Sequence, residues 1–344
     1  MSTPSNWLLY CRAGFERDCW IDAGAQAQNT ELGEGWVRCQ HIRPEWSRLA
    51  FARQVIKLVG EVTALPERDR LTPLLAALPA QPQAFSAVWL EVPDTSEGKT
   101  LSGFTRRFTP LLETTLRAQQ RLDTARPDLP RLHIFFPTHQ RALLGISDPA
   151  LSAPWPMGIL RLRMPADAPS RSTLKLAEAI EVLVEDKHAL RAGMTAVDLG
   201  AAPGGWTWQL VRRGIKVCAV DNGPLKGSVA IHPLVQHTRA DGFKFQPRHP
   251  VDWLVCDMVE QPQRVAALIA QWIVKGWARR ALFNLKLPMK KRSEALAQAC
   301  ALIDDSLRAE GIAYSLRAKQ LYHDREEVTL YLARTNNKGR RKPR

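Results

Sequence analysis

The sequence predicts an α/β protein with a C-terminal half built on a doubly wound parallel sheet and an N-terminal half of α+β type. Strand and helix patterns alternate regularly after residue 170, as they do in parallel sheets with crossover helices. A glycine-rich loop follows the first of these strands. Four prolines between residues 154 and 169 separate the two halves, which is typical of a linker.

Length and composition indicate a folded protein of several domains. At about 100–200 residues per domain, 344 residues make two or three. The longest apolar stretch, 265–274, has about half the length that a membrane span needs, and the N-terminus lacks the regions of a signal peptide. The six cysteines form no Cys-x-x-Cys pair, which argues against structural zinc. We therefore expect a cytoplasmic protein that binds no metal.

Positive charge is concentrated in the C-terminal half. The chain carries +14, of which residues 1–150 contribute +1 and residues 151–344 contribute +13. The last eleven residues hold six Lys or Arg and no acid, so we expect 334–344 to be a disordered basic tail. This balance fits a polyanionic partner such as nucleic acid, although a solubilising surface explains it equally well.

The N-terminal half is expected to fall into two segments. Residues 1–60 contain four tryptophans, which predict a small core of their own. Residues 61–165 carry seven arginines between positions 106 and 141. The expected strands of this half are 7–11, 36–42, 87–92 and 132–136, and the expected helices are 15–28 and 111–122.

The C-terminal half begins with a helix and then alternates. The expected helices are 172–190, 206–213, 265–276 and 293–310. The expected strands are 195–199, 216–220, 234–238, 251–257, 281–286, 313–318 and 327–333.

The strongest local signal is the segment 196–206, Ala-Val-Asp-Leu-Gly-Ala-Ala-Pro-Gly-Gly-Trp. A buried strand ends at Asp198, a glycine loop follows, and a helix begins near Gly205. Ligands of open α/β sheets bind beyond the carboxyl ends of the strands, and glycines let the backbone approach a ligand closely. The spacing is neither Gly-x-Gly-x-x-Gly nor Gly-Lys-Ser/Thr, which disfavours pyrophosphate binding and a nicotinamide oxidoreductase.

Aspartates stand at the ends of four successive strands, namely Asp198, Asp221, Asp241 and Asp257. An acid about twenty residues after the glycine loop is placed to accept the ribose hydroxyls of a nucleoside. Asp241 is placed to meet an adenine amino group. A cationic nucleoside with an amino group suits four acids on one rim, and S-adenosylmethionine is such a ligand.

These motifs together resemble the FtsJ-type ribose 2′-O-methyltransferases. The matching segments are 171–175 (Arg-Ser-Thr-Leu-Lys), 198–206, 220–223 (Val-Asp-Asn-Gly), 241–245 (Asp-Gly-Phe-Lys-Phe), 256–260 (Cys-Asp-Met-Val-Glu), 284–291 (Asn-Leu-Lys-Leu-Pro-Met-Lys-Lys) and 322–328 (Tyr-His-Asp-Arg-Glu-Glu-Val). The resemblance is closest to members that methylate one cytidine of 23S rRNA, and it covers 150–333 densely. It implies a Rossmann-like class I methyltransferase domain over 166–333, whose sheet closes with an antiparallel strand, and S-adenosylmethionine as the cofactor.

The resemblance also implies an N-terminal organisation and a partner. Such family members have a small ferredoxin-like region, matched here to 1–60, and a THUMP RNA-binding domain, matched to 61–165. This part of the match is looser. The implied partner is 23S rRNA or a pre-50S ribosomal particle, bound by a monomer without membrane contact.

The family's Lys–Asp–Lys–Glu catalytic tetrad has a match at every position. The matching residues are Lys175, Asp257, Lys286 and Glu327. Glu326 is the alternative to Glu327, which we prefer because the family's glutamate directly precedes the valine at 328. For the cofactor the resemblance implies Ser172, Ala202, Pro203, Gly204, Gly205, Asp221, Asp241 and Asp257. Close relatives often have cysteine where Ala202 stands, a change that a loop binding through its backbone should tolerate.

These residue types suit methyl transfer to an alcohol. The hydroxyl must lose its proton, and a lysine accepts a proton only as a neutral amine, although its ordinary pKa is ~10.4. Burial and a second ammonium nearby both lower that pKa. We therefore predict Lys286 as the general base, with the two carboxylates holding the lysines in place.

Cations near this site predict how RNA is held. They are Arg279, Arg280, Lys290, Lys291 and Arg292, and with the 106–141 arginines they form two candidate RNA surfaces. Two alternatives stay open, a 2′-O-methyltransferase for tRNA or another rRNA nucleotide and a catalytically silent RNA-binding assembly factor. The intact tetrad speaks against the second.

Overall fold

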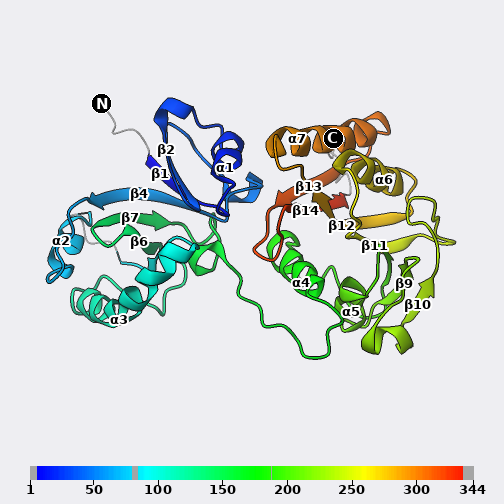
Figure 1. Ribbon diagram of the computed structural model, residues 1–344, viewed down its shortest axis with the longest axis horizontal. Helices are drawn as coiled ribbons and strands as arrows, with labels where there is room; N and C mark the ends of the chain where they lie inside the picture. Colours follow the sequence, from blue (N-terminus) through cyan, green and yellow to red (C-terminus); the bar gives the residue numbers. More distant parts are fainter. Residues whose placement is uncertain (1–5, 80–83, 187, 336–344) are drawn as a thin grey trace, which may run out of the picture. The chain divides into compact units, whose positions relative to one another are not determined.

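The computed structural model describes residues 6–79, 84–186 and 188–335. The chain divides into two units, residues 1–160 and residues 161–344. In the described residues each unit contains one seven-stranded sheet with helices packed on it (Figure 1). No helix in these residues is long and apolar enough to cross a membrane.

The N-terminal unit is a mixed sheet with the strand order β2-β3-β1-β4-β7-β6-β5. Its strands are β1 (Asn6–Tyr10), β2 (Thr30–Gly33), β3 (Trp36–Gln40), β4 (Gln54–Val62), β5 (Ala87–Glu91), β6 (Arg131–Thr138) and β7 (Arg141–Ser147). Its helices are α1 (Glu16–Asp22), α2 (Leu71–Ala76) and α3 (Ser96–Ala118), with short 3₁₀ turns at Ala27–Asn29, Trp46–Arg48 and Pro156–Gly158. Of the strand pairs in the described part of this unit, only β5 and β6 run parallel.

One sheet runs through both expected N-terminal segments. The expected border at residues 60 and 61 falls inside β4, which pairs with β1 on one side and β7 on the other. The start of the linker is fixed to this sheet, because Gln54 Nε2 donates to Ala153 O and Met157 N donates to Glu91 Oε1. The unit therefore extends to residue 160, whereas the linker was expected to end at 165.

Helix α3 is longer than the periodicity of 111–122 predicts. It begins at Ser96, where the Thr95 hydroxyl accepts a hydrogen bond from Gly98 N and so caps the helix. It ends at Ala118, and Leu122 leaves the helix to form a parallel bridge with Phe85. Both predicted ends were wrong, because the cap and the bridge are contacts that an apolar period does not contain.

The C-terminal unit is the predicted doubly wound sheet, with the order β10-β9-β8-β11-β12-β14-β13. Its strands are β8 (Thr195–Leu199), β9 (Lys216–Val220), β10 (Val235–Thr238), β11 (Val251–Cys256), β12 (Ala278–Lys286), β13 (Tyr314–Lys319) and β14 (Glu327–Arg334). Its helices are α4 (Ser172–Leu183), α5 (Gly205–Val211), α6 (Pro262–Val274) and α7 (Arg292–Ala309), with a 3₁₀ turn at Gly227–Ile231. Strand β14 runs antiparallel to β12 and β13, as expected.

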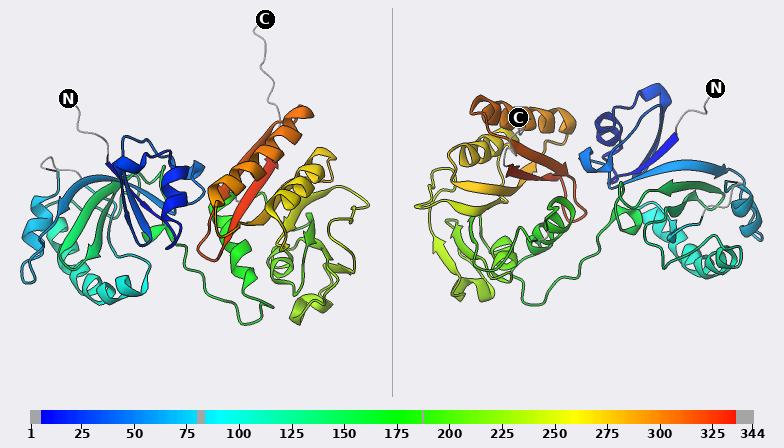
Figure 2. Two further views of the ribbon diagram at one scale, coloured as in Figure 1. Left: turned by 45° about the horizontal axis from the view of Figure 1, so that its top comes forward. Right: turned by 180° about the vertical axis from the view of Figure 1, so that it is seen from behind.

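The helices of this unit cover both faces of the sheet. Figures 1 and 2 show α4 beside α5 on one face and α6 beside α7 on the other. The chain leaves β8 toward β9 and β10 and then returns to β11 on the other side of β8. Such a reversal of strand order opens a crevice at the carboxyl ends of β8 and β11, where α/β proteins bind ligands.

Several predicted borders of this unit were wrong: α6 and β12 each begin three residues earlier than expected, and two further borders also differ. Helix α4 ends at Leu183 rather than Leu190, because Val184 is extended and Ala189 O accepts a hydrogen bond from Trp253 Nε1 instead of one within the helix. Strand β14 includes Arg334, which was expected to begin the tail. Thr335 N donates to Ala313 O, and the rest of the expected tail, 336–344, lies outside the described residues.

Candidate active site

Two adjoining cavities lie at the carboxyl ends of β8, β9 and β11. Their volumes are about 690 and 380 Å³, and both are lined by Gly200, Ala202 and Asp257. The larger cavity also contains Lys175 and Glu327 of the predicted tetrad. The smaller one contains Asp221 and Asp241, the two predicted adenosine ligands.

The glycine loop follows β8 and forms part of both cavities. Gly200 has a φ of +76° and Gly204 a φ of +113°, a region that favours glycine. A Cβ added to Gly200 would lie 2.6 Å from Met258 Cγ, and one added to Gly205 would collide with the Ser172 hydroxyl. The loop therefore has no space for a side chain at Gly200 or Gly205. A ligand can bind beside Ala202 and Pro203, which line the larger cavity.

The start of α4 packs directly against this loop. Thr173 Oγ1 donates to Gly205 O at 3.1 Å, and the hydroxyls of Ser170 and Ser172 are 2.7 Å apart. Both serines line the larger cavity. The predicted cofactor residue Ser172 thus stands where α4 meets the glycine loop.

The smaller cavity has two carboxylates at its edge. Asp221 accepts hydrogen bonds from Ala202 N at 2.9 Å and Gly223 N at 2.7 Å, which ties the end of β9 to the glycine loop. Asp241 is exposed and accepts one from Phe243 N at 2.9 Å. The positions suit the ribose and the adenine amino group of a nucleoside.

Asp198 does not line the cavities with Asp221, Asp241 and Asp257, contrary to expectation. Its side chain is completely buried below the loop, where its Oδ2 accepts a hydrogen bond from Thr207 Oγ1 at 2.6 Å. Its Oδ1 has no hydrogen-bond partner among the described residues. Burial raises the pKa of Asp198 to about 7. The charges of Asp257 and Asp221 also raise this pKa, and the hydrogen bond from Thr207 lowers it.

Three of the four tetrad residues form one cluster. Lys175 Nζ lies 3.1 Å from Glu327 Oε1 and 3.6 Å from Asp257 Oδ1. Burial alone lowers the pKa of Lys175, but Asp257 and Glu327 outweigh it and the pKa is raised above its ordinary value. The pKa of Glu327 is lowered, because Lys175 and backbone hydrogen bonds outweigh its burial. Lys175 is therefore a protonated amine that Asp257 and Glu327 hold in place.

Lys286 stands at the edge of this cluster. It is the last residue of β12 and pairs across the sheet with Glu327, so the two side chains leave the same face. The Lys286 side chain is exposed, and within the described ranges it forms no ion pair. The structure thus brings its backbone, but not its ammonium group, to the other three residues.

Glu326 and Glu327 have different partners. Glu326 Oε2 lies 3.2 Å from Arg292 Nη2, outside the cavity, whereas Glu327 faces Lys175. Of the two candidates, only Glu327 lines the larger cavity.

Sequence reasoning missed several residues that line the larger cavity, among them Arg171, Tyr322, His323 and Arg325. The buried carboxylate of Glu178 holds this loop, because it accepts hydrogen bonds from Tyr322 N and His323 N at 2.9 Å and lies 2.6 Å from His323 Nδ1. The signal was available, since Tyr322 and His323 belong to the same motif as Glu327.

The predicted basic surfaces are smaller than the arginine count suggests. Arg141 forms ion pairs with Glu31 and Glu61, and Arg131 donates to Ser152 Oγ and Ala153 O. Both arginines therefore hold the N-terminal unit together. Of the seven arginines between 106 and 141, Arg106 and Arg107 are exposed on α3 and form no ion pair within the described ranges.

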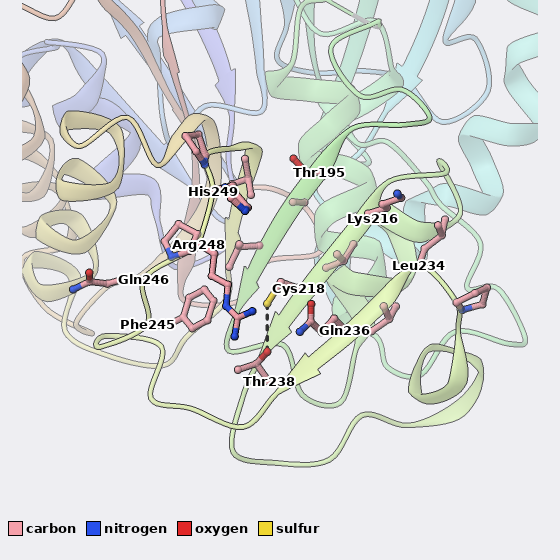
Figure 3. Close-up of a pocket in the computed structure, with 18 residues that line it drawn as sticks. Thr195, Lys216, Cys218, Leu234, Gln236, Thr238, Phe245, Gln246, Arg248 and His249 are labelled. Atoms are coloured by element: carbon pink, nitrogen blue, oxygen red, sulfur yellow. Dashed lines mark hydrogen bonds between the residues drawn. The ribbon is translucent and has the colours of Figure 1, made fainter.

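A third cavity, of about 660 Å³, contains none of the predicted site residues (Figure 3). It lies on the flank of the sheet beside β8, β9 and β10, where the connection to β11 contains no helix. Cys218 Sγ and Thr238 Oγ1, on β9 and β10, lie 3.5 Å apart in this cavity. Arg248 and His249 line it from the loop that precedes β11. Among the described residues, no group of three His, Cys, Asp or Glu is placed to hold a metal.

Three family models match the chain. They are the FtsJ-like methyltransferase over 168–328, the N-terminal domain of ribosomal RNA large subunit methyltransferase M over 69–148, and the RlmM ferredoxin-like domain over 5–44. Among solved structures, TrmN from Thermus thermophilus matches with 15% identity over 96% of this chain and 100% of that chain. Its TM-score of 0.35 is too low to carry an argument.

Curated relatives match the chain along its whole length. A protein of Laribacter hongkongensis named ribosomal RNA large subunit methyltransferase M is 55% identical over 98% of this chain and 99% of its own length. A protein of the same name from Azoarcus sp. is 51% identical over 95% of this chain and 96% of its own. The chain is therefore an S-adenosylmethionine-dependent methyltransferase, and it belongs to the ribosomal RNA large subunit methyltransferase M family.

Proposed function

We propose that this protein methylates the ribose 2′-hydroxyl of a single cytidine in 23S rRNA, with Lys286 as the general base. The observation that carries the proposal is the cluster of Lys175, Asp257 and Glu327 in the larger cavity, next to a smaller cavity with two carboxylates. A hydroxyl acceptor needs a residue that removes its proton, and we assign this step to Lys286, which pairs across the sheet with Glu327 of the cluster. The large-subunit rRNA substrate follows the names of the relatives.

The residues present fit S-adenosylmethionine. The narrow glycine loop admits a ligand beside Ala202, Asp221 and Asp241 suit the adenosine, and Asp257 stands between the two cavities. The bound cofactor supplies a methyl group on a positively charged sulfur. The carboxylate of Asp257 favours positive charge at this junction.

We assign acceptance of the hydroxyl proton to Lys286, because Lys175 keeps its own proton. Two carboxylates hold Lys175 and raise its pKa, so it keeps its proton. Lys286 leaves the same face as Glu327 and is the other amine of the tetrad. When RNA covers the cavity, Lys286 is the amine that takes the hydroxyl proton.

The RNA contacts follow from the remaining cations. Arg171 and Arg325 line the larger cavity, and Lys290 is exposed beyond β12. We assign phosphate binding to these residues and to Arg106 and Arg107 of the N-terminal unit, which acts as a THUMP-type RNA-binding arm. The working form is a cytoplasmic monomer that acts on 23S rRNA or a pre-50S particle.

The experiment is transfer of a labelled methyl group to rRNA from cells that lack the enzyme, followed by nucleoside mapping. The label should appear on one 2′-O-methylcytidine of 23S rRNA. Lys286→Ala should lower turnover by about 10²–10⁴-fold with near-normal cofactor affinity, because a base acts in the transition state. Label on a nucleobase, on tRNA or on another nucleotide would refute the assignment, and a Lys286→Ala variant with a tenth of normal turnover would refute the base.

A further inference from the structure

A chain of hydrogen bonds runs from Asp257 into the buried part of the C-terminal unit. Asn284 Nδ2 donates to Asp257 Oδ1 at 2.7 Å. Thr329 Oγ1, on the strand paired with that of Asn284, lies 2.7 Å from Asn284 Oδ1 and 3.0 Å from Asp324 Oδ2. Asn284, Thr329 and Asp324 are at most 2% exposed. Water therefore cannot supply a missing donor or acceptor easily, and the protons in the chain must be counted.

The hydrogen-bond chain from Asp257 to Asp324 lacks one proton if both of these carboxyl groups are ionised. Asn284 uses its amino group on Asp257, so its Oδ1 must accept the hydroxyl hydrogen of Thr329. A threonine hydroxyl has one hydrogen, and Thr329 then faces Asp324 with a lone pair. A contact of 3.0 Å between two oxygens is attractive only if Asp324 carries a proton and donates it.

The reverse orientation of Asn284 does not remove the deficit. In that orientation Thr329 donates to Asp324 and accepts from the Asn284 amino group. The Asn284 oxygen then lies 2.7 Å from Asp257 Oδ1, which must carry a proton instead. In either direction, Asp257 and Asp324 hold one proton between them.

The surroundings decide which carboxyl group holds it. Burial raises the pKa of Asp257 as well, but the ammonium of Lys175, 3.6 Å from Asp257 Oδ1, and the hydrogen bond from Asn284 oppose this rise. Asp324 is 1% exposed, and the charged groups around it are Lys175 and the acid Glu178 of α4 together with Lys319 of β13, which is 4% exposed and pairs across the sheet with Thr329. Burial raises the pKa of Asp324 well above its ordinary value, and the hydrogen bond from Leu321 N, Lys175 and Thr329 oppose this only in part.

We propose that Asp324 is a neutral carboxylic acid that donates to Thr329 and, through Asn284, orients the Asp257 carboxylate beside Lys175. The inference rests on the proposed function in one respect, that Asp257 belongs to the working site. Asp324 is a positioning residue, because it lies outside both cavities.

A neutral Asp324 also limits the negative charge of the site. Asp257 and Glu327 are then the two carboxylates that hold the Lys175 ammonium. An ionised Asp324 would add a third negative charge near this cluster and raise the pKa of Lys175 further.

Two substitutions of Asp324 test its protonation through turnover. Asp324→Ala removes the donor and should lower methyl transfer about tenfold or more, the scale of a buried partner left unsatisfied. Asp324→Asn supplies an N–H to Thr329 and an oxygen to Leu321 N, so it should restore turnover and the wild-type pH profile. Thr329→Val should match Asp324→Ala, and Thr329→Ser, which keeps the hydroxyl, is its control. An Asp324→Asn variant as impaired as Asp324→Ala, or with a shifted pH profile, would overturn the proposal.

Infrared spectroscopy tests the same point without turnover. Protein labelled with ¹³C at its aspartate carboxyl carbons should show, at neutral pH, the carbonyl band of protonated acids. The difference between wild type and Asp324→Asn should contain the band of Asp324, because the contribution of Asp198, whose pKa is about 7, is present in both proteins and cancels. A difference spectrum that shows only the bands of an ionised carboxylate would overturn the proposal even if the variant folds poorly. If the wild type methylates no RNA, the proposed function fails, while this spectrum still decides the state of Asp324.

Discussion

At the residue scale, Asp221 is the clearest single contact to test. It accepts hydrogen bonds from the glycine loop and lines the cavity assigned to adenosine. Asp221→Ala should weaken S-adenosylmethionine binding by about 1.5–3 kcal/mol, the scale of a hydrogen bond to a charged group. Calorimetry measures the change, with Asp252→Ala as a control, since Asp252 accepts from Thr195 outside both cavities. Equal affinity in wild type and a folded Asp221→Ala variant would remove the assignment.

Asp198 gives a prediction about stability and pH. Its pKa is about 7 in the folded protein and ~3.9 in an unfolded chain, so the folded state binds more protons between these values. The free energy of unfolding should therefore fall as pH rises from about 4 to about 7, and stay level above that as far as this group is concerned. Asp198→Asn cannot ionise and should lack this fall.

The measurement for Asp198 is urea unfolding of both proteins at a series of pH values. The stability of the variant relative to wild type should rise through the window and then level off. Other groups titrate alike in both proteins and cancel in the difference. A difference that does not change with pH would show that Asp198 ionises normally.

At the scale of the element, two glycines of α3 should respond in opposite ways to alanine. A Cβ on Gly98 would collide with the backbone carbonyl of Pro93, whereas a Cβ on Gly103 would meet nothing within 4 Å. Gly103→Ala should stabilise the protein by about 0.5–1 kcal/mol, because glycine loses more backbone entropy in a helix. Gly98→Ala should destabilise it, since a backbone carbonyl has to move. Denaturant unfolding checks both, and equal effects of the two substitutions would contradict the packing described here.

Elements of the C-terminal unit were predictable from sequence because apolar patterns determine them. Strands β8 and β9 were predicted to the residue, since parallel strands buried on both faces give short apolar runs between glycine loops. Strands β4 and β7 were missed, although β4 alone joins the two halves of the N-terminal sheet. The start of α3 was missed because its first turns are polar and depend on the Thr95 cap and on close packing at Gly98.

The candidate site was predictable only where a motif contained it. Lys175, Asp257 and Glu327 come from three elements, and the resemblance named all three before the structure placed them together. The burial of Asp198 was not foreseeable, because Thr207 closes over it from the following helix. The partners of Arg141 were not foreseeable either, since Glu31 and Glu61 approach it only in the folded sheet.

At the scale of the whole molecule, RNA binding should depend on salt and on both units. If about six phosphates of looped or single-stranded RNA are neutralised, log affinity should fall with log salt concentration at a slope near −4. Reversing both Arg106 and Arg107 to Glu should weaken binding and flatten the slope, while S-adenosylmethionine affinity stays unchanged. Reversal of Arg126 is the matched control, because that exposed arginine already pairs with Asp128. Equal slopes for wild type and the double variant would show that the N-terminal unit is not an RNA-binding arm.

The pairing of β4 with β7 has a consequence for how the protein is made. Lys57 pairs with Ile146, so the middle of the N-terminal sheet joins residues that are far apart in the chain. During translation β1, β3 and β4 can associate early, but the other edge of β4 stays open until the chain has grown from Val62 past Arg141. Contacts of such long sequence separation form late, and an unpaired strand edge promotes aggregation. The nascent chain is therefore most vulnerable while α2, β5 and α3 are being synthesised.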